Sequence, residues 1–338
     1  MIVFGILAVV GMAHQIGWYR IAGTLANASL LFIICYLATS LLIALVLTLK
    51  WKLILHSQNI NVPYTKLFTY RMVCYSVSYL TPTAHVGGEP IRAYLLQREN
   101  VPLNTAFSTV IIDKSIELMA DVVFFFIGAL IITGSVAVEG RMKLVLLVVS
   151  FLLIGLMAWF IHGILAKKSL FVAIFRFFRL NTIQRFMPIE KNIAKIEKEI
   201  ERFYRYKKEY FIIIMILILV LWILMFFEYR FILLMLGHKA SPLQIFLILT
   251  GVGLAYSIPI PAAMGVLELG QLSAAKVLRL SSATGIALAF IIRTRDLLWT
   301  AIGLFFLSTY HFDFFRLSKK TQQIDKEFEQ GKLFKKRT

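Results

Sequence analysis

Uninterrupted apolar runs decide the fold class of this chain before any other feature. Residues 211–236 read FIIIMILILVLWILMFFEYRFILLML, with only two charged residues among them. Such a run exceeds the roughly 20 residues that a helix needs to cross the hydrocarbon core of a membrane. Across the chain 59% of the residues are hydrophobic and 16% are charged, whereas about 25% are charged in a soluble domain. The alternating ten-residue segments of a membrane barrel do not occur, so we predict an all-α polytopic integral membrane protein.

Eight segments are long and apolar enough to be counted as spanning helices. Two more, 83–98 and 262–279, are apolar but short and interrupted, which is typical of re-entrant or broken helices. The sequence therefore predicts about eight spanning helices and two broken ones in a single transmembrane domain over 1–338. The eight segments are about 2–17, 28–49, 63–80, 104–133, 142–163, 210–236, 243–259 and 283–308.

The net charge of +18 is concentrated in two stretches. Residues 166–210 contain twelve Lys and Arg against five acids, and the tail at 316–338 contains eight against three. Both stretches are expected in the cytoplasm, because Lys and Arg are enriched on that side of a membrane. We therefore predict a multi-pass protein of the cell membrane with both termini cytoplasmic. No nucleic acid is expected as a partner, because the basic residues flank membrane segments and no nucleic-acid-binding motif accompanies them.

The segment at 164–209 leaves the membrane and contains an amphipathic helix. Its apolar residues recur at alternating spacings of four and three, which places them on one face of a charged helix. Such a helix either lies on the membrane surface or packs on another helix. The apolar residues are Ile189, Ile193, Ile196, Ile200 and Phe203.

Two parts of the chain resemble each other at a nearly constant separation. The spacing predicts a duplicated unit, with chance similarity between apolar segments as the alternative. Counting membrane crossings from the basic segment makes the two copies inverted, which is a recurring design of transporters. Repeat 1 covers about 28–133 and repeat 2 about 210–309, with the helix at 142–163 as a linker. At a separation of 179, Pro63 pairs with Pro242, Pro82 with Pro261 and Glu89 with Glu268, while Asp113 pairs with Arg293 at 180.

The broken segments carry charges that no loop explains. Glu89 and Arg92 lie three residues apart and can pair on one helical face. An ionisable group at membrane depth costs free energy and is a candidate for function, although an internal ion pair that pins the turn is the alternative. Glycine and proline allow the backbone to open here. The expected hinge and turn residues are Gly87, Gly88, Pro82, Pro90, Pro259, Pro261 and Gly265.

Further charges lie in the long segment 104–133 and in its counterpart. Asp113, Glu117 and Asp121 are spaced four residues apart, on one helical face that must avoid lipid, and Lys114 lies beside them. The counterpart carries Arg293, Arg295 and Asp296. These groups either neutralise one another across the bundle or line a cavity that offers acids to an amine and arginines to a phosphate.

The remaining polar residues have simpler interpretations. His85 is expected to form hydrogen bonds rather than to relay protons, and Arg71 and Arg230 to extend toward an interface. The only cysteines, Cys35 and Cys74, do not form a metal site or a disulfide framework. We expect no metal, no cofactor and no enzymatic centre, since no phosphate-binding loop or nucleophile motif occurs.

Four stretches together resemble a known family. TPTAHVGGEPIRAYLL, IIDKSIELMADVV, IPIPAAMGVLE and IIRTRDLLW are similar to the membrane domain of lysylphosphatidylglycerol synthases and its stand-alone relatives, over roughly residues 30–310. The resemblance implies lipid movement between leaflets. The site residues that it implies are Glu89, Arg92, Asp113, Glu117, Glu268 and Arg293. Where the family has glycine-rich entries to its motifs, this sequence has Thr83-Ala84-His85-Val86 and Ala262-Ala263.

The resemblance also limits what this protein is expected to do. After Arg316 only the basic tail follows, so we expect a stand-alone member without the aminoacyl-transfer domain. The predicted function is the movement of a lipid with a charged headgroup, namely an aminoacyl phospholipid, an anionic phospholipid or a polyprenyl-linked glycolipid. The alternative is a partner that docks a separate transferase on its lipid substrate. A homo-oligomer is compatible with either function.

Overall fold

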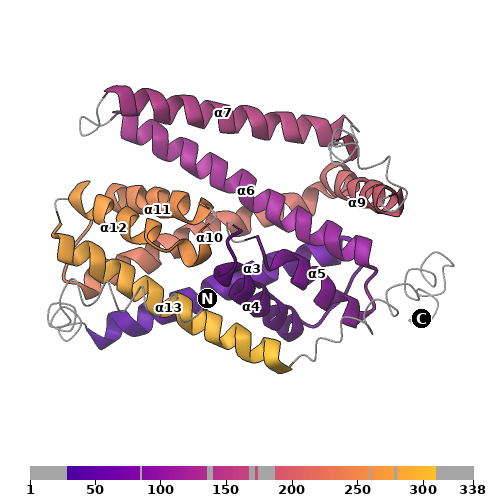
Figure 1. Ribbon diagram of the computed structural model, residues 1–338, viewed down its shortest axis with the longest axis horizontal. Coiled ribbons are helices and arrows are strands. Elements are labelled where there is room, and N and C mark those ends of the chain that lie inside the picture. Colours follow the sequence, from indigo (N-terminus) through magenta and orange to yellow (C-terminus); the bar gives the residue numbers. More distant parts are fainter. Residues whose placement is uncertain are drawn as a thin grey trace.

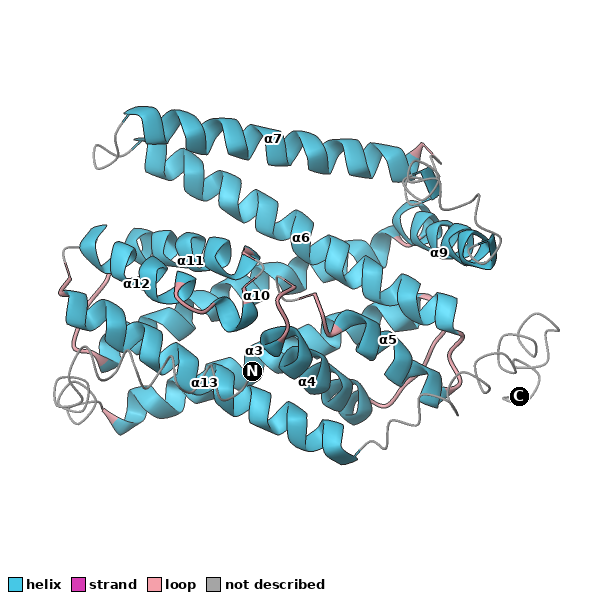
Figure 2. Ribbon diagram, viewed as in Figure 1, coloured by secondary structure: helices cyan, strands magenta, loops and turns pink. Residues whose placement is uncertain are grey.

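A computed structural model describes residues 29–83, 86–134, 140–166, 172–173, 187–258, 260–277 and 280–309. Throughout these ranges the regular elements are helices, as Figure 2 shows, which confirms the all-α prediction. The expected first span at 2–17, His85, Pro259 and the tail at 316–338 lie outside the described residues. The helices are α3 (Leu30–Ser57), α4 (Tyr64–Leu80), α5 (Glu89–Leu96), α6 (Leu103–Gly134), α7 (Gly140–Leu165), α9 (Met187–Tyr206), α10 (Lys208–Met235), α11 (Pro242–Ser257), α12 (Val266–Val277) and α13 (Ser282–Thr309).

Three helices are long and apolar enough to cross a membrane by length and composition alone. They are α3, the part of α7 from Lys143 to Leu165, and α10. At 32 and 28 residues, α6 and α13 are also long enough, and each has charged side chains in its middle. Figure 1 shows α6 and α13 running in opposite directions along the long axis of the molecule. This is the direction that an inverted repeat requires.

Two helical hairpins complete the bundle. At 17 and 16 residues, α4 and α11 are shorter than the helices around them, and each is followed by a short helix, α5 or α12. We counted 63–80 and 243–259 as spans from the sequence; in the structure each is the first arm of a helical hairpin, and the number of spans stays a prediction. Figure 1 places α5 toward the end of the bundle where α9 lies and α12 toward the other end. The two hairpins thus enter from opposite ends.

The prolines and glycines expected at the breaks have distinct structural roles. Pro90 lies in the first turn of α5, where the missing N–H costs nothing, so it begins a helix instead of interrupting one. Pro261 begins the 3-10 turn Pro261–Ala263. Gly265 has a φ of +78°, a conformation that favours glycine, just before α12. The tip of the first hairpin is closed by the N–H of Gly88, which donates to Ser78 Oγ at 2.9 Å.

The helix contacts repeat between the two halves. α3 packs along α10, α4 packs against α13 and α11 against α6, while α5 and α12 pack against α6 and α13. Exchanging α3 with α10, α4 with α11, α5 with α12 and α6 with α13 leaves this set of contacts unchanged. We propose that the two halves are inverted copies, because this exchange matches the spacing of the sequence repeat. A glycine faces a hydroxyl-bearing residue at both outer crossings, Gly303 against Ser76 and Gly128 against Thr250.

α9 is held against the bundle by its apolar face. Ile200 and Phe203 are buried, and α9 packs against α6 and α7. Of the two expected positions for this amphipathic helix, the structure therefore shows packing on other helices. One carboxylate of α9 joins this contact, because Ser108 Oγ of α6 donates to Glu199 Oε2 at 2.5 Å and Thr105 Oγ1 donates to Glu199 Oε1 at 3.0 Å.

Gly88 should be intolerant of any side chain, because a Cβ there would collide with the backbone carbonyl of Cys74 in α4. We expect Gly88→Ala to lower the free energy of unfolding by about 1–3 kcal/mol, as overpacking does. Gly155→Ala in α7 is the matched control, because nothing lies within 4 Å of its Cβ position. Thermal unfolding in detergent measures both, and equal melting temperatures for the two variants would contradict the packing at Gly88.

The contact of α9 with α6 should strengthen as the pH falls. Burial raises the pKa of Glu199 above its ordinary value, although the two hydroxyl donors and Arg202 act in the opposite direction. A raised pKa in the folded state means that stability is greatest below the ordinary pKa of Glu and is lost as the pH rises through the folded value. Hydrogen exchange should show several-fold stronger protection of α9 near pH 5 than near pH 7.5, after correction for intrinsic rates.

Glu199→Gln should remove most of that pH dependence, since its side chain stays neutral. The matched control is Glu201→Gln, on the same helix, which removes a carboxylate that pairs with Arg205 at 3.4 Å. Protection that increases with pH in the parent protein would show that the contact does not favour the protonated carboxyl.

Candidate functional site

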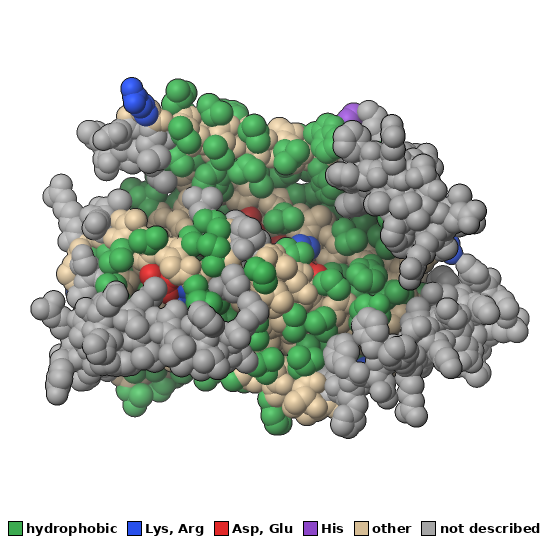
Figure 3. Space-filling view, viewed as in Figure 1, with side chains coloured by type: hydrophobic (Ala, Val, Ile, Leu, Met, Phe, Trp, Pro, Cys, Tyr) green, Lys and Arg blue, Asp and Glu red, His purple; other side chains and the backbone are tan. Residues whose placement is uncertain are grey.

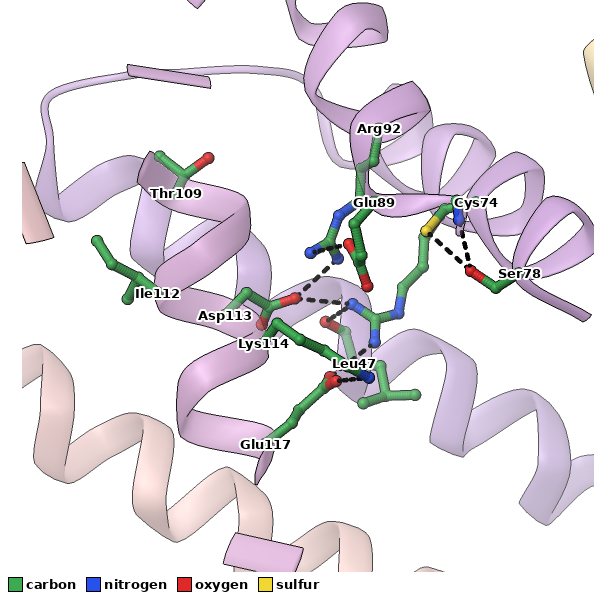
Figure 4. A network of polar contacts seen from close by, with 12 residues as sticks. Leu47, Cys74, Ser78, Glu89, Arg92, Thr109, Ile112, Asp113, Lys114 and Glu117 are labelled. Atoms are coloured by element: carbon green, nitrogen blue, oxygen red, sulfur yellow. Dashed lines mark hydrogen bonds and ion pairs between the residues drawn. The ribbon is translucent and has the colours of Figure 1, made fainter. Parts of the chain in front are cut away.

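Asp113 of α6 is the centre of a buried group of charges. Its Oδ1 lies 2.9 Å from Lys50 Nζ of α3, and its Oδ2 accepts a hydrogen bond from Arg92 NH1 of α5 at 2.7 Å. Arg71 of α4 reaches Oδ2 at 3.3 Å. Figure 4 shows the side chains of Asp113 and Arg92 pointing toward each other between α6 and α5. Asp113, Lys50 and Arg92 are at most 1% exposed, so one carboxylate neutralises cations from three helices.

Glu117 lies one turn further along α6 and shares these cations. Its Oε1 accepts hydrogen bonds from Lys50 Nζ at 2.6 Å and from Arg71 NH2 at 3.1 Å. Its Oε2 accepts from Lys114 Nζ at 3.2 Å. Glu117 and Lys114 are both partly exposed, so this group of charges is open on one side. We call Lys50, Arg71, Glu89, Arg92, Asp113, Lys114 and Glu117 the first network.

Arg92 is the least satisfied member of the first network. Its guanidinium carbon lies 4.5 Å from the centre of the Trp51 ring, a cation–π contact. Arg92 NH2 is 2.8 Å from Glu89 Oε2, yet neither atom makes a hydrogen bond, and Arg92 Nε has no partner either. The predicted pairing of Glu89 with Arg92 is therefore confirmed as an ion pair of poor geometry.

Arg293 of α13 forms a second group, in which the guanidinium is saturated. Nε and NH2 donate to the two oxygens of Glu268 at 2.8 and 3.2 Å, and NH1 donates to the hydroxyl of Tyr79 at 3.0 Å. NH1 and NH2 also donate to the carbonyls of Ala262 and Ala263. All five N–H donors of an arginine are thus used. We call this group the Arg293 clasp.

The clasp holds the backbone at the tip of the second hairpin. Ala262 and Ala263 have φ values of +53° and +48°, a left-handed conformation that costs an alanine about 1–2 kcal/mol. These alanines lie in one of the two motif entries where the resemblance led us to expect a glycine-rich stretch. Hydrogen bonds from Arg293 to both carbonyls stabilise a conformation that glycine would adopt unaided.

Arg295 and Asp296 of α13 make a third group. Arg295 NH1 donates to Glu228 Oε1 of α10 at 2.6 Å, and Arg295 Nε and NH2 donate to Asp296 Oδ1. The hydroxyls of Tyr75 and Tyr256 donate to Asp296 at 2.9 and 2.8 Å. We call Arg295, Asp296, Glu228, Tyr75 and Tyr256 the second network.

The structure thus sorts the predicted site residues into three groups. Glu89, Arg92, Asp113, Lys114 and Glu117 come together in the first network, while Asp121 is exposed and joins no ion pair among the described residues. The acids of α6 do not neutralise the arginines of α13 across the bundle. Each half neutralises its own charges, so Glu268 does not meet Glu89 and Arg92 in one network.

Three charged residues of these networks were missed or misjudged from the sequence. Lys50 and Glu228 were not among the predicted site residues. Arg71 was expected to extend toward an interface, which was wrong, because it pairs with Asp113 and Glu117. The available signal was an ionisable residue inside an apolar run. Arg230, with a similar expectation, donates to the carbonyl of Ala240.

Replacing Asp113 should be far more costly than replacing Asp121. Asp113→Asn leaves Lys50, Arg71 and Arg92 short of one buried negative charge, and breaking a buried ion pair costs about 3–5 kcal/mol. Asp121→Asn, two turns away on the same helix, should stay within about 0.5 kcal/mol of the parent. Chemical unfolding in detergent checks both, and a similar loss in the two variants would refute the central role of Asp113.

Within the described residues no group of three or more His, Cys, Asp and Glu side chains is placed to hold a metal ion. The chemistry available is instead that of charge pairing, since Arg and Lys bind phosphate and carboxylate while acids bind amines.

The amino-acid sequence is similar to a known family and to several known proteins. Residues 1–303 match the family described as the lysylphosphatidylglycerol synthase TM region. A UPF0104 membrane protein of Methanothermobacter thermautotrophicus is 31% identical over 137 residues, 40% of each chain. Its counterpart in Methanocaldococcus jannaschii is 24% identical over 62% of this chain and 61% of its own. That of Pyrococcus horikoshii is 25% identical over 80% of this chain and 84% of its own.

The chain therefore spans less than two thirds of the first two relatives, and no solved structure matches it. The family match covers most of the chain and includes both hairpins and all three groups of charges. From this match and the helical architecture, the chain belongs to the family of the lysylphosphatidylglycerol synthase TM region.

Proposed function

We propose that this protein moves lipids with charged headgroups between the two leaflets of the cell membrane. The candidates are an aminoacyl phospholipid, an anionic phospholipid and a polyprenyl-linked glycolipid. The family's name links its members to a synthase of a charged phospholipid. The architecture supports movement, because hairpins that enter from opposite ends are a recurring feature of transporters.

The observation that carries this proposal is the partly exposed charge on α6. Lys114 and Glu117 are 22% and 18% exposed, and Asp121 is more exposed still, near the middle of the long helix α6. An ion exposed to hydrocarbon costs several kcal/mol, so a charged surface at this depth favours a polar occupant. Figure 3 shows acidic and basic side chains at the bottom of a hollow in a face covered mainly by hydrophobic ones.

The outer surface of the protein suits the acyl chains of such a lipid. Leu144, Val148, Leu152 and Trp159 of α7 are more than half exposed, which is typical of a helix that faces lipid. In this proposal a headgroup travels over the charges of α6 while its acyl chains stay in the membrane. The end at which α9 lies would face the cytoplasm, because its surroundings are basic.

The direct test is lipid movement in vesicles that contain the purified protein. Fluorescent phosphatidylglycerol, lysyl-phosphatidylglycerol and a polyprenyl-linked glycolipid are placed in both leaflets, and the outer label is quenched chemically. We expect the protein to accelerate the loss of the inner label for at least one of these lipids over protein-free vesicles. Acceleration should fall at least tenfold in Lys114→Gln, because one positive charge facing the headgroup is lost.

A second outcome separates the transporter from a membrane partner of a transferase. If no charged lipid moves faster than in protein-free vesicles, the transport proposal fails. Docking of a separate transferase would then be the better function. Binding to the lipid without movement would distinguish this partner role from an inactive preparation.

A further inference from the structure

The glutamates that occupy equivalent places in the two repeats are held very differently. Glu268 makes two hydrogen bonds to Arg293, whose other donors bind Tyr79 and two backbone carbonyls. Glu89, 179 residues earlier, reaches Arg92 at 2.8 Å without a hydrogen bond. Glu89 thus makes no hydrogen bond to its arginine, whereas Glu268, at the equivalent place, makes two.

Arg92 has the donors to bind a better partner. Its side chain is only 1% exposed, yet the buried atoms Nε and NH2 make no hydrogen bonds. A buried donor without a partner costs about 1–3 kcal/mol, and more for a charged group. A planar guanidinium whose Nε and NH2 make no hydrogen bonds along one edge matches the two oxygens of a phosphate or a carboxylate. The unsatisfied edge of Arg92 is therefore suited to an oxyanion.

The charge balance of the first network also favours an anion. Its four cations are Lys50, Arg71, Arg92 and Lys114, and its carboxylates are Glu89, Asp113 and Glu117. One positive charge is left over, and two would be left over if Glu89 moved away. Asp113 and Glu117 are each shared among several cations, whereas Glu89 forms an ion pair with Arg92 alone among the described residues. Glu89 is therefore the carboxylate most easily exchanged.

The position of Glu89 allows this exchange. It begins the eight-residue helix α5, directly after Gly87 and Gly88, and its side chain is 14% exposed. Figure 4 shows the Glu89 carboxylate between α5 and α6, pointing into the middle of the first network. Glu89 also interacts electrostatically with Lys114, which is partly exposed. An anion that arrives along Lys114 would reach the place that Glu89 holds.

We infer that Arg92 and Lys114 bind the phosphate of a lipid headgroup, and that the Glu89 carboxylate occupies this place in the lipid-free protein. This inference rests on the proposed function and adds the residues that hold the phosphate of the headgroup and a way of releasing it. When the phosphate enters, Glu89 turns away. When Glu89 returns, it competes with the phosphate for Arg92, so the lipid is not held indefinitely.

The inference predicts that removal of a charged site residue, Glu89, strengthens the binding of the lipid instead of weakening it. Glu89→Gln keeps the size of the side chain and removes the competing charge. Native mass spectrometry with phosphatidylglycerol in detergent should show a Kd about tenfold lower than that of the parent. Arg92→Gln should raise the Kd at least tenfold. Unchanged or weaker binding by Glu89→Gln, with a melting temperature like that of the parent, would overturn the inference.

Controls identify what is bound and exclude a general effect of charge. Glu201→Gln on α9 also removes a carboxylate paired with an arginine, and it should leave the Kd unchanged. Diacylglycerol, which lacks the phosphate, should bind weakly and equally to the parent and to Glu89→Gln. Tightening for diacylglycerol would overturn the phosphate site. Equal affinity for inorganic phosphate and phosphatidylglycerol would support the phosphate site but overturn its lipid source.

A vesicle measurement separates this inference from the proposed function. Glu89→Gln should move phosphatidylglycerol several-fold more slowly than the parent, because tighter binding delays release. If the parent moves no lipid but Glu89→Gln binds it more tightly, the proposed function fails while the phosphate site stands. If the parent moves lipid and Glu89→Gln moves and binds it like the parent, the phosphate site fails while the proposed function stands.

Discussion

The need to neutralise charge inside an apolar bundle determines how this protein is built. Asp113 is the clearest case, because its carboxylate faces cations from α3, α4 and α5 while it lies on α6 itself. None of these helices can rotate or slide by a turn without leaving a buried ion alone. The long apolar helices therefore gain a fixed register from polar contacts, since their apolar faces alone would fit in several ways.

Both halves neutralise buried charges, but the charged residue that α3 contributes is positive and the one that α10 contributes is negative. α3 presents Lys50 to the acids of α6, and α10, which packs along α3, presents Glu228 to Arg295 of α13. Lys50 lies 13 residues before Pro63 and Glu228 lies 14 before Pro242, so the two occupy similar places before the two hairpins. The inversion of charge leaves the first network with an excess of cations and the second with an excess of acids. In the proposed duplication, one framework thus supports two chemically different sites.

The sequence predicted the elements well and their partners poorly. Apolar runs and the Pro and Gly clusters placed most helix ends within a few residues, because both features act locally, but α3 continues to Ser57, eight residues past the predicted end at 49. The rotation of each helix is a different matter. Lys50 and Lys52 are the only Lys, Arg, Asp or Glu residues of α3, and its apolar residues lie on all sides, so no periodic pattern indicates which face meets α6. For the same reason Arg71 resembled an interfacial residue, and only the tertiary structure shows that it reaches Asp113 and Glu117.

α4 connects the halves through its hydroxyl groups. Tyr75, Ser76 and Tyr79, which belong to the first hairpin, bind Asp296, the Thr300 carbonyl and Arg293 of α13. Two of these contacts reach the same short stretch of α13 that holds the tip of the second hairpin. A tilt of α13 would therefore move both hairpin tips at once, because α13 is hydrogen-bonded to both hairpins. Such a linkage makes it difficult for one hairpin to move while the other stays still.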